Sequence, residues 1–305
     1  MKVFSKVAMV GSAVVIAAFA LTAQAQELTG TLKKIKDSGT ITLGHRDTSI
    51  PFSYYDDKQQ VIGYAMDICM KAVDAVKAEL KMPNLKVVLN PVTSATRIPL
   101  IANGTIDLEC GSTTNNVDRQ KQVAFTYTYF VTANRYVAKK SSNIKTLADL
   151  KGKTVVSTSG TTNIKWLTEE NAKQNMGMNI LAAKDHAEAF LMVETDRAVA
   201  FFMDDILLYS LVASAKAPAD FVVGSEAYSV EPYGAMMPKD DPDFAKVVNT
   251  ALGTLFKSGQ IMPIYDKWFL KPVPPKGINL NVPVSPQLKA AFANPSNSGD
   301  PANYK

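Results

Sequence analysis

The chain has 305 residues, of which 47% are hydrophobic and 20% are charged, and its formal net charge is +5. This composition is that of a globular protein with one large or two medium domains, which excludes a disordered or fibrous chain. The lysines and arginines are dispersed, and a net charge this small does not favour a nucleic-acid partner.

The first 25 residues have the pattern of a secretory signal peptide. Lys2 and Lys6 precede an uncharged apolar run over residues 7–21, and residues 23–25 (AQA) form a small-residue cleavage site. The apolar run is too short and wrongly flanked for a membrane span, and no later run reaches that length. We therefore expect residues 1–25 to be removed and the mature protein to be exported and soluble.

The chain has two cysteines, Cys69 and Cys110, and two histidines, His45 and His186. In an oxidising compartment a single cysteine pair favours a disulfide, which would stabilise the fold by ~4 kcal/mol in the chain-entropy model. These four residues match no recognised zinc-ligand spacing, so we expect no metal site.

The first half of the chain alternates between strands and helices. Hydrophobic periodicity predicts helices over residues 28–38, 65–81 and 94–102, and strands over residues 40–43, 86–89 and 106–109. Alternation at this spacing predicts a mostly parallel α/β sheet. A strand over residues 133–138 has no helix before it, which indicates a crossover.

A second alternating segment begins near residue 153. We expect strands over residues 154–157, 180–181, 198–203 and 221–223, and helices over residues 164–176, 186–195 and 206–213. A strand over 230–237 and helices over 241–258 and 262–269 follow, and the tail from residue 271 is expected to be mostly irregular. Two such segments joined by crossing strands near 131–138 and 226–236 predict two lobes with a cleft between them.

Polar residues at the ends of predicted strands indicate an anion site. Arg97 lies on the helix over 94–102, and the hydroxyl-rich loop over 111–114 follows the strand over 106–109, where open α/β sheets bind ligands. A second hydroxyl-rich loop, over 159–162, opens a helix whose N–H groups and dipole suit a carboxylate. Arginine can bind a carboxylate through two parallel hydrogen bonds.

The charges of the candidate residues match an L-α-amino dicarboxylate. Arg46 and Arg97 would each face one carboxylate and Asp204 the ammonium, while a ligand carboxylate in a closed cleft would hold His186 protonated. Each residue also has a structural interpretation. Arg46 would pair with Asp47, Asp204 would cap the helix that follows it, His186 would lie on the surface near a helix start, and the loop over 159–162 would be a plain helix entry.

Several spaced motifs occur in both halves of the chain. They are Arg97, residues 104–108 (GTIDL), Thr113, Arg119, Phe125-Thr126 and Tyr129, together with residues 44–47 (GHRD), 51–54 (PFSY), 108–115 (LECGSTTN), 185–186 (DH) and 203–205 (MDD). The first group resembles the polar-amino-acid solute-binding proteins of ABC importers, and the second resembles their glutamate/aspartate-binding subgroup. Thr128 departs from the wider family, where a proline often precedes the aromatic residue.

The resemblance implies a type II periplasmic-binding-protein fold, in which two α/β lobes are joined by two crossing strands and close on a ligand. Lobe 1 would be discontinuous, over residues 26–132 and 231–305, and lobe 2 would cover residues 133–230. The protein would be a monomeric periplasmic receptor, without a cofactor, that delivers L-glutamate and L-aspartate to a membrane permease.

The resemblance also implies the ligand-binding residues. They are Arg46, Ser94, Arg97, Ser112, Thr114, Thr161, Thr162, His186 and Asp204. Arg97 matches the arginine that clamps a carboxylate and Asp204 the aspartate that binds the ammonium, while the amides of the Thr161-Thr162 loop take the α-carboxylate. The cysteine pair fits the subgroup. Which carboxylate each arginine takes, and whether glutamate or aspartate is preferred, stay open.

Two alternatives belong to other classes of protein. A periplasmic enzyme on the same fold, such as a dehydratase of small carboxylic acids, would need a proton-transfer group, for which Glu109 and His186 are the candidates. The sequence contains no Gly-x-Ser-x-Gly, P-loop or His-Glu-x-x-His motif, and we expect no enzyme. A sensor domain shed from a chemoreceptor is disfavoured because no later membrane span occurs.

Overall fold

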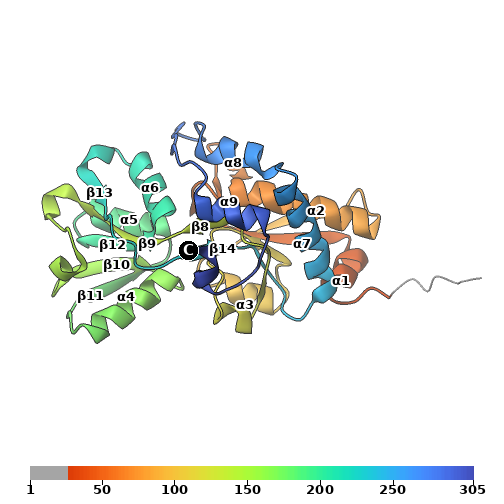
Figure 1. Cartoon of the computed structure of the whole chain (residues 1–305), viewed down its shortest axis with the longest axis horizontal. Helices are drawn as coiled ribbons and strands as arrows, with labels where there is room; N and C mark the ends of the chain where they lie inside the picture. The colour runs from red at the N-terminus through yellow and green to blue at the C-terminus, as the bar shows by residue number, and fades with distance from the viewer. Residues whose placement is uncertain (1–26) are drawn as a thin grey trace, which may run out of the picture.

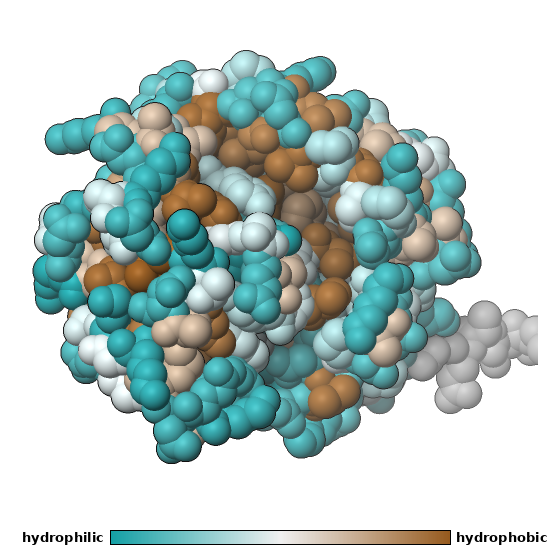
Figure 2. Space-filling model, turned by 60° about the vertical axis from the view of Figure 1, so that its left-hand side comes forward, coloured by the Kyte–Doolittle hydropathy of each residue, from teal (hydrophilic) through white to brown (hydrophobic). Residues whose placement is uncertain are grey.

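The computed structural model describes residues 27–305, so the expected signal peptide lies outside the described residues. Two α/β lobes lie side by side and are joined by a narrow waist (Figure 1). Polar side chains cover most of the face in Figure 2, and apolar side chains gather along a recessed band. Within residues 27–305, no helix is both long enough and apolar enough to cross a membrane.

Lobe 1 is built on a five-stranded sheet in the order β5-β1-β6-β15-β7. The strands are β1 (Thr40–His45), β5 (Lys86–Pro91), β6 (Leu108–Cys110), β7 (Ala124–Phe125) and β15 (Met236–Met237). β1 pairs in parallel with β5 and β6, whereas β15 runs antiparallel to β6 and β7. Because parallel strands end at one edge, the loops after β1 and β6 come together there.

Helices cover the lobe-1 sheet with their apolar faces. They are α1 (Gly30–Ser38), α2 (Tyr64–Leu80), α3 (Arg97–Ala102), α7 (Pro242–Lys257), α8 (Ile261–Phe269) and α9 (Pro286–Ala293). In α2, Ile68, Cys69, Ala72, Val73 and Val76 recur on one face and are all buried. A small antiparallel sheet precedes α2, formed by β2 (Thr48–Ser49), β3 (Ser53–Tyr55) and β4 (Val61–Ile62).

Lobe 2 has a second five-stranded sheet, in the order β11-β10-β12-β9-β13. Its strands are β9 (Asn134–Lys139), β10 (Thr154–Thr158), β11 (Asn179–Ala183), β12 (Ala200–Asp204) and β13 (Phe221–Val223), and its helices are α4 (Thr162–Lys173), α5 (His186–Glu194) and α6 (Asp205–Ser214). β10 pairs in parallel with β11 and β12, and β9 runs antiparallel to β12. Short 3₁₀ helices complete the chain: η1 (Arg119–Lys121), η2 (Lys140–Ser142), η3 (Leu147–Leu150), η4 (Pro218–Asp220) and η5 (Pro301–Tyr304).

Two short strands connect the lobes. β8 (Phe130–Thr132) and β14 (Glu231–Tyr233) pair antiparallel at the waist in Figure 1, near the C-terminus. The chain leaves lobe 1 through β8 into β9 and returns through β14 to β15. The predicted fold class, two α/β lobes joined by two crossing strands, is therefore confirmed.

The predicted strand over 230–237 was wrong as a single element. It divides at Gly234 into β14, which pairs with β8, and β15, which joins the lobe-1 sheet. Gly234 passes close to the neighbouring main chain, because a Cβ placed on it would lie 3.0 Å from the Thr126 carbonyl oxygen. Pro232 and Gly234 lie within the predicted strand, and a proline or glycine inside a strand pattern is the signal in the sequence for such a break.

The tail from residue 271 is mostly irregular, as predicted, but it contains α9 and is bonded to the rest of lobe 1. The Ser285 hydroxyl accepts a hydrogen bond from the Leu288 N–H at 3.1 Å and caps α9, and the Phe292 ring packs 5.0 Å from that of Phe256. Farther on, the Thr128 N–H donates to the Ser296 carbonyl at 2.9 Å. A proline at position 128 would have no such N–H. The hydrogen bond to the C-terminal segment is therefore possible only because this chain has Thr128 where the wider family often has proline.

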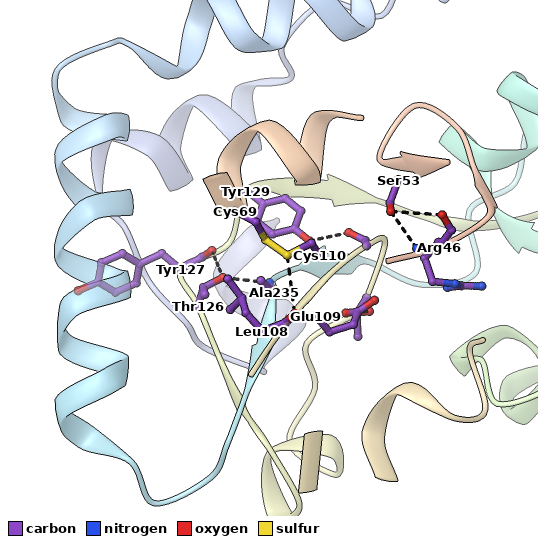
Figure 3. The surroundings of a disulfide bond; sticks show 12 residues. Arg46, Ser53, Cys69, Leu108, Glu109, Cys110, Thr126, Tyr127, Tyr129 and Ala235 are labelled. Carbon is purple, nitrogen blue, oxygen red and sulfur yellow. Dashed lines mark hydrogen bonds between the residues drawn. A yellow bond between two sulfur atoms is a disulfide. The ribbon is translucent and has the colours of Figure 1, made fainter. Parts of the chain in front are cut away.

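The predicted disulfide is confirmed. Cys69 on α2 and Cys110 at the end of β6 are bonded, with their Cα atoms 6.1 Å apart, and Figure 3 shows the bond beside Tyr129. The Tyr129 hydroxyl donates to the Gly111 carbonyl at 2.6 Å. The loop that follows β6 is thus attached to both α2 and the start of the waist.

Candidate functional site

A small cavity of about 10 Å³ lies between the two lobes. Its wall is formed from both lobes, by Ser94, Arg97, Ser112, Thr114, Thr161, Thr162, Asn163, His186, Met203, Asp204 and Leu207. Eight of the nine residues predicted from the sequence are in this wall, and the ninth, Arg46, is not. The structure therefore brings together candidate residues that are more than 100 positions apart in the chain.

The lobe-1 side of the cavity depends on where α3 begins. The helix was predicted from Ser94 but starts at Arg97, because Thr93 and Thr96 close a turn first. The Thr93 N–H donates to the Thr96 hydroxyl at 3.0 Å, and the Thr96 N–H donates to the Thr93 hydroxyl at 3.2 Å. The turn leaves Ser94 outside the helix, where its hydroxyl is buried without a hydrogen-bond partner.

Arg97 is buried and held by a chain of hydrogen bonds. Its Nη1 donates to the Ser112 carbonyl at 3.3 Å and to the Thr113 hydroxyl, which donates to Glu109 Oε2 at 2.6 Å. Its Nε has no protein partner. Glu109 is fully buried and does not line the cavity, so it orients the guanidinium through Thr113.

Arg46 lies behind the cavity wall and is also buried. Its main-chain N–H donates to the Ser53 hydroxyl at 2.8 Å, and its Nη1 has no partner (Figure 3). No ion pair joins Arg46 to Asp47 in the described part of the chain, so that structural interpretation was wrong. Burial, and then the charge of Arg97, lower the pKa of Arg46 to about 10. A ligand anion beside both guanidiniums would offset the free-energy cost of burying two positive charges close together.

The lobe-2 loop over 159–162 does cap a helix. The Thr161 hydroxyl accepts from the Ile164 N–H at 3.2 Å and donates to the Thr158 carbonyl at 2.7 Å. Because α4 begins at Thr162, the first N–H groups of the helix lie at the cavity, where the helix dipole favours a negative charge. The cap and an anion site are therefore compatible.

His186 opens α5 and is buried rather than exposed, so the surface interpretation was wrong. Its Nδ1 lies 2.9 Å from the Thr158 hydroxyl, and its Nε2 has no partner. Burial, followed by the charges of Arg46 and Arg97, holds the pKa of His186 well below its ordinary value. The imidazole of the protein alone is therefore neutral, unlike the protonated form expected in a liganded cleft. If Thr158 donates to Nδ1, Nε2 is a hydrogen-bond donor.

Asp204 ends β12 and precedes α6, but its side chain does not cap that helix. Its Oδ1 accepts from Asn163 Nδ2 at 2.8 Å, and its Oδ2 accepts from the Tyr233 hydroxyl. Burial, and then the charge of Glu231, raise the pKa of Asp204 to about 7. A nearby ammonium would favour the ionised carboxylate and lower this pKa.

Sequence reasoning missed Asn163 and Tyr233. Asn163 lies in the first turn of α4, where it donates to both Asp204 and Asn134, and Tyr233 reaches Asp204 from β14. Neither position carries a local pattern, because each acquires its role from an element distant in the sequence.

Five of the nine predicted residues carry a buried polar atom without a protein hydrogen-bond partner. These atoms are Arg46 Nη1, Ser94 Oγ, Arg97 Nε, Ser112 Oγ and His186 Nε2. A buried polar group left unpaired costs about 1–3 kcal/mol, and such groups are uncommon in native proteins. Their concentration at one place is typical of a site for a polar ligand.

The family of the chain follows from comparison with known proteins. Residues 41–271 match the bacterial extracellular solute-binding proteins, family 3. The chain belongs to this family. The family 3 match covers both five-stranded sheets and the cavity between them. A binding protein rather than an enzyme was predicted, and this is confirmed; the dehydratase alternative is not supported.

Curated relatives match most of the chain. The L-glutamate/L-aspartate-binding protein of Pseudomonas aeruginosa is 55% identical over 289 residues, which cover 94% of this chain and 96% of the relative. The glutamate/aspartate import solute-binding protein of Escherichia coli is 48% identical over 266 residues, which cover 87% of this chain and 88% of the relative.

Solved structures share the fold at lower identity. An ancestral arginine-binding protein bound to arginine has a TM-score of 0.68 and 28% identity, covering 76% of this chain and 98% of that one. A cysteine-binding protein from Campylobacter jejuni has a TM-score of 0.70 and 26% identity, covering 79% of this chain and 93% of that one.

Proposed function

We propose that the chain is a periplasmic receptor that binds L-glutamate and L-aspartate by cleft closure and delivers them to the permease of an ABC importer. The observation that carries this proposal is a group of unpaired, buried polar atoms, four of them on residues of the cavity wall, including Arg97, and the fifth on Arg46. The names of the relatives from Pseudomonas aeruginosa and Escherichia coli support the same ligands.

The polar groups at the cavity correspond to those of an acidic amino acid. Arg97 Nε, Arg46 Nη1 and the hydroxyls of Ser94 and Ser112 are suited to carboxylate oxygens, as is His186 Nε2. We assign the α-carboxylate to the start of α4, with Thr114, Thr161 and Thr162 around it. Asp204, whose two oxygens are already oriented by Asn163 and Tyr233, takes the ammonium.

Because two arginines are buried here, the second carboxylate of the ligand should determine the affinity. Arg46 is buried with an unpaired Nη1, and its pKa is lowered to about 10, so its positive charge is expensive without an anion nearby. Glutamine would leave the guanidiniums without that anion. Because these groups are charged, the cost is about 3 kcal/mol or more, which is over about a hundredfold in affinity. We therefore expect acidic amino acids to be preferred over their amides by well over tenfold.

The remaining parts of the proposal concern the chain as a whole. We propose that residues 1–25 direct export and that the receptor acts as a monomer. We also propose a discontinuous lobe 1, up to residue 132 and over 231–305, with lobe 2 over residues 133–230. The pairing of β8 with β14 supports these lobe boundaries.

Thermal denaturation in the presence of each of the twenty amino acids tests the proposal. The protein is first unfolded and refolded to remove any bound ligand. Glutamate and aspartate at 1,000 times Kd should each stabilise the protein by about 4 kcal/mol, because they bind only the folded state. A stabilisation of equal size by glutamine or arginine, or none by either acid, would reject it.

A further inference from the structure

Arg119 contacts the binding loops of both lobes. It begins η1 in lobe 1 and is only 7% exposed. Its Nη1 donates to the Thr114 carbonyl at 2.7 Å, and its Nη2 donates to the Gly160 carbonyl at 3.2 Å. Gly160 directly precedes Thr161, the residue that caps α4. One guanidinium therefore joins the main chains of the lobe-1 and lobe-2 loops.

The main chains of the two lobes also meet beside this contact. Gly160 has a φ of +76°, and a Cβ placed on it would lie 2.6 Å from Ala95 Cα and 2.8 Å from the Ser94 carbonyl carbon. Only glycine fits at such a distance, and its left-handed backbone also favours glycine. The Gly160 main chain thus packs on residues 94–95 while its carbonyl accepts from Arg119.

Arg119 is prepared for this contact by lobe 1 alone. Its N–H donates to Asn116 Oδ1 at 2.9 Å, and the side chains of Asn115 and Gln120 both donate to the Asn297 carbonyl in the C-terminal segment. Because these bonds and the Thr114 bond lie within lobe 1, the guanidinium is positioned before the lobes meet. Closing on Gly160 then costs little side-chain entropy.

Arg119 is a buried charge, and its hydrogen bond to the Gly160 carbonyl can form only when the cleft is closed. No carboxylate forms an ion pair with it among residues 27–305, and both of its side-chain acceptors are carbonyls. Burial, and then the charge of Arg97, lower its pKa to about 10. A hydrogen bond from a charged donor to a carbonyl is strong in such a setting, and it is lost when Gly160 moves away.

We propose that Arg119 is a positioning residue that fastens the two binding loops across the closed cleft and so slows release of the ligand. Arg119 does not line the cavity, and its action is through the carbonyls of Thr114 and Gly160. The inference rests on the proposed binding function, because release requires a ligand that the cleft encloses.

The test compares ligand release from four variants by stopped-flow fluorescence, with L-glutamate as the probe. Arg119→Met removes both hydrogen bonds, and Arg119→Lys keeps the charge but can reach one carbonyl. Gly160→Ala acts from the other lobe by blocking the approach to Ala95. Lys165→Met is the matched control, because it removes the Asp118–Lys165 pair, whose side chains are 57% and 61% exposed and whose atoms lie 3.0 Å apart across the same cleft.

We expect Arg119→Met to raise the dissociation rate about tenfold to a hundredfold, with the association rate nearly unchanged. Arg119→Lys should fall between this variant and wild type. Lys165→Met should change the rate by less than about fivefold, because exposed ion pairs contribute little. Gly160→Ala should raise Kd and, in small-angle scattering, leave the protein expanded when glutamate is added.

Three results would overturn the inference. They are an unchanged dissociation rate in Arg119→Met, a loss confined to the association rate, and an equal loss in Lys165→Met. If Arg119→Met does not fold, the dissociation rate of Arg119→Lys and the affinity of Gly160→Ala decide between the outcomes. Glutamate binding by the wild type is measured first, so a failure of the proposed function is seen separately. In that case the same variants are compared with whichever amino acid stabilises the wild type.

Discussion

Replacing Asp204 with asparagine should weaken ligand binding and at the same time stabilise the protein without ligand. Asparagine has nearly the same shape and can still accept from Asn163, but it carries no charge. The carboxylate of Asp204 is buried, and its pKa of about 7 lies well above the ordinary value of 3.8. Folding therefore favours the neutral acid, and the ionised form reduces stability at neutral pH.

The size of this effect follows from the two pKa values. Stability from the neutral acid is fully present below pH 3.8 and is lost as the pH rises through about 7. With about 1.4 kcal/mol for each unit of pKa, ionisation of Asp204 lowers the free energy of unfolding by about 4 kcal/mol at pH 8 but by well under ~1 kcal/mol at pH 4. Asp204→Asn should recover most of this difference at pH 8 and little at pH 4.

Urea denaturation at pH 4, 6 and 8 measures the stability, and calorimetry with glutamate measures the binding. The variant should bind at least about a hundredfold more weakly at pH 8, because the ammonium loses a buried partner charge. In the wild type Kd should rise by up to about tenfold for each pH unit below 7, and this slope should disappear in the variant. A variant that is no more stable at pH 8 than wild type, or that binds normally, refutes this reasoning.

Three further substitutions test other parts of the structure. Arg97→Ala should abolish detectable glutamate binding in calorimetry, and normal binding would exclude Arg97 as the carboxylate clamp. Replacing Cys69 and Cys110 with serine should lower the free energy of unfolding by ~4 kcal/mol in the chain-entropy model, measured in urea; the reduced wild type is the control, and an unchanged midpoint would contradict this. Tyr304→Phe removes the hydroxyl that accepts from the Thr128 hydroxyl at 2.9 Å, and it should lower the free energy of unfolding by about 1–2 kcal/mol. An unchanged free energy of unfolding would show that this bond does not hold the C-terminal segment in place.

The sequence predicted candidate residues best where they lie at positions that a local pattern marks. Arg97 and the hydroxyl loops were found because strand ends, glycines and capping residues mark their positions, and parallel strands bring such ends together. The cysteine pair followed from compartment chemistry alone. These features depend on residues close in the sequence or on a single pairing, which a pattern can specify.

Contacts between elements that are distant in the chain could not be predicted from the sequence. Asn163 and Tyr233 orient Asp204 only because α4, β12 and β14 meet at the cleft. Arg46, a predicted binding residue, is not part of the cavity wall, and its main-chain N–H is bonded to the Ser53 hydroxyl. The predicted strand over 230–237 likewise spans the point where the chain passes from the waist to the lobe-1 sheet.

Calorimetric titration of the refolded protein with L-glutamate, L-aspartate, L-glutamine and L-asparagine tests the charge argument most directly. Both acids should bind well over tenfold more tightly than either amide, because only they bring a side-chain carboxylate to Arg46 and Arg97. Equal affinity for glutamine and glutamate would show that the buried guanidiniums do not select the ligand, and the proposed function would fail.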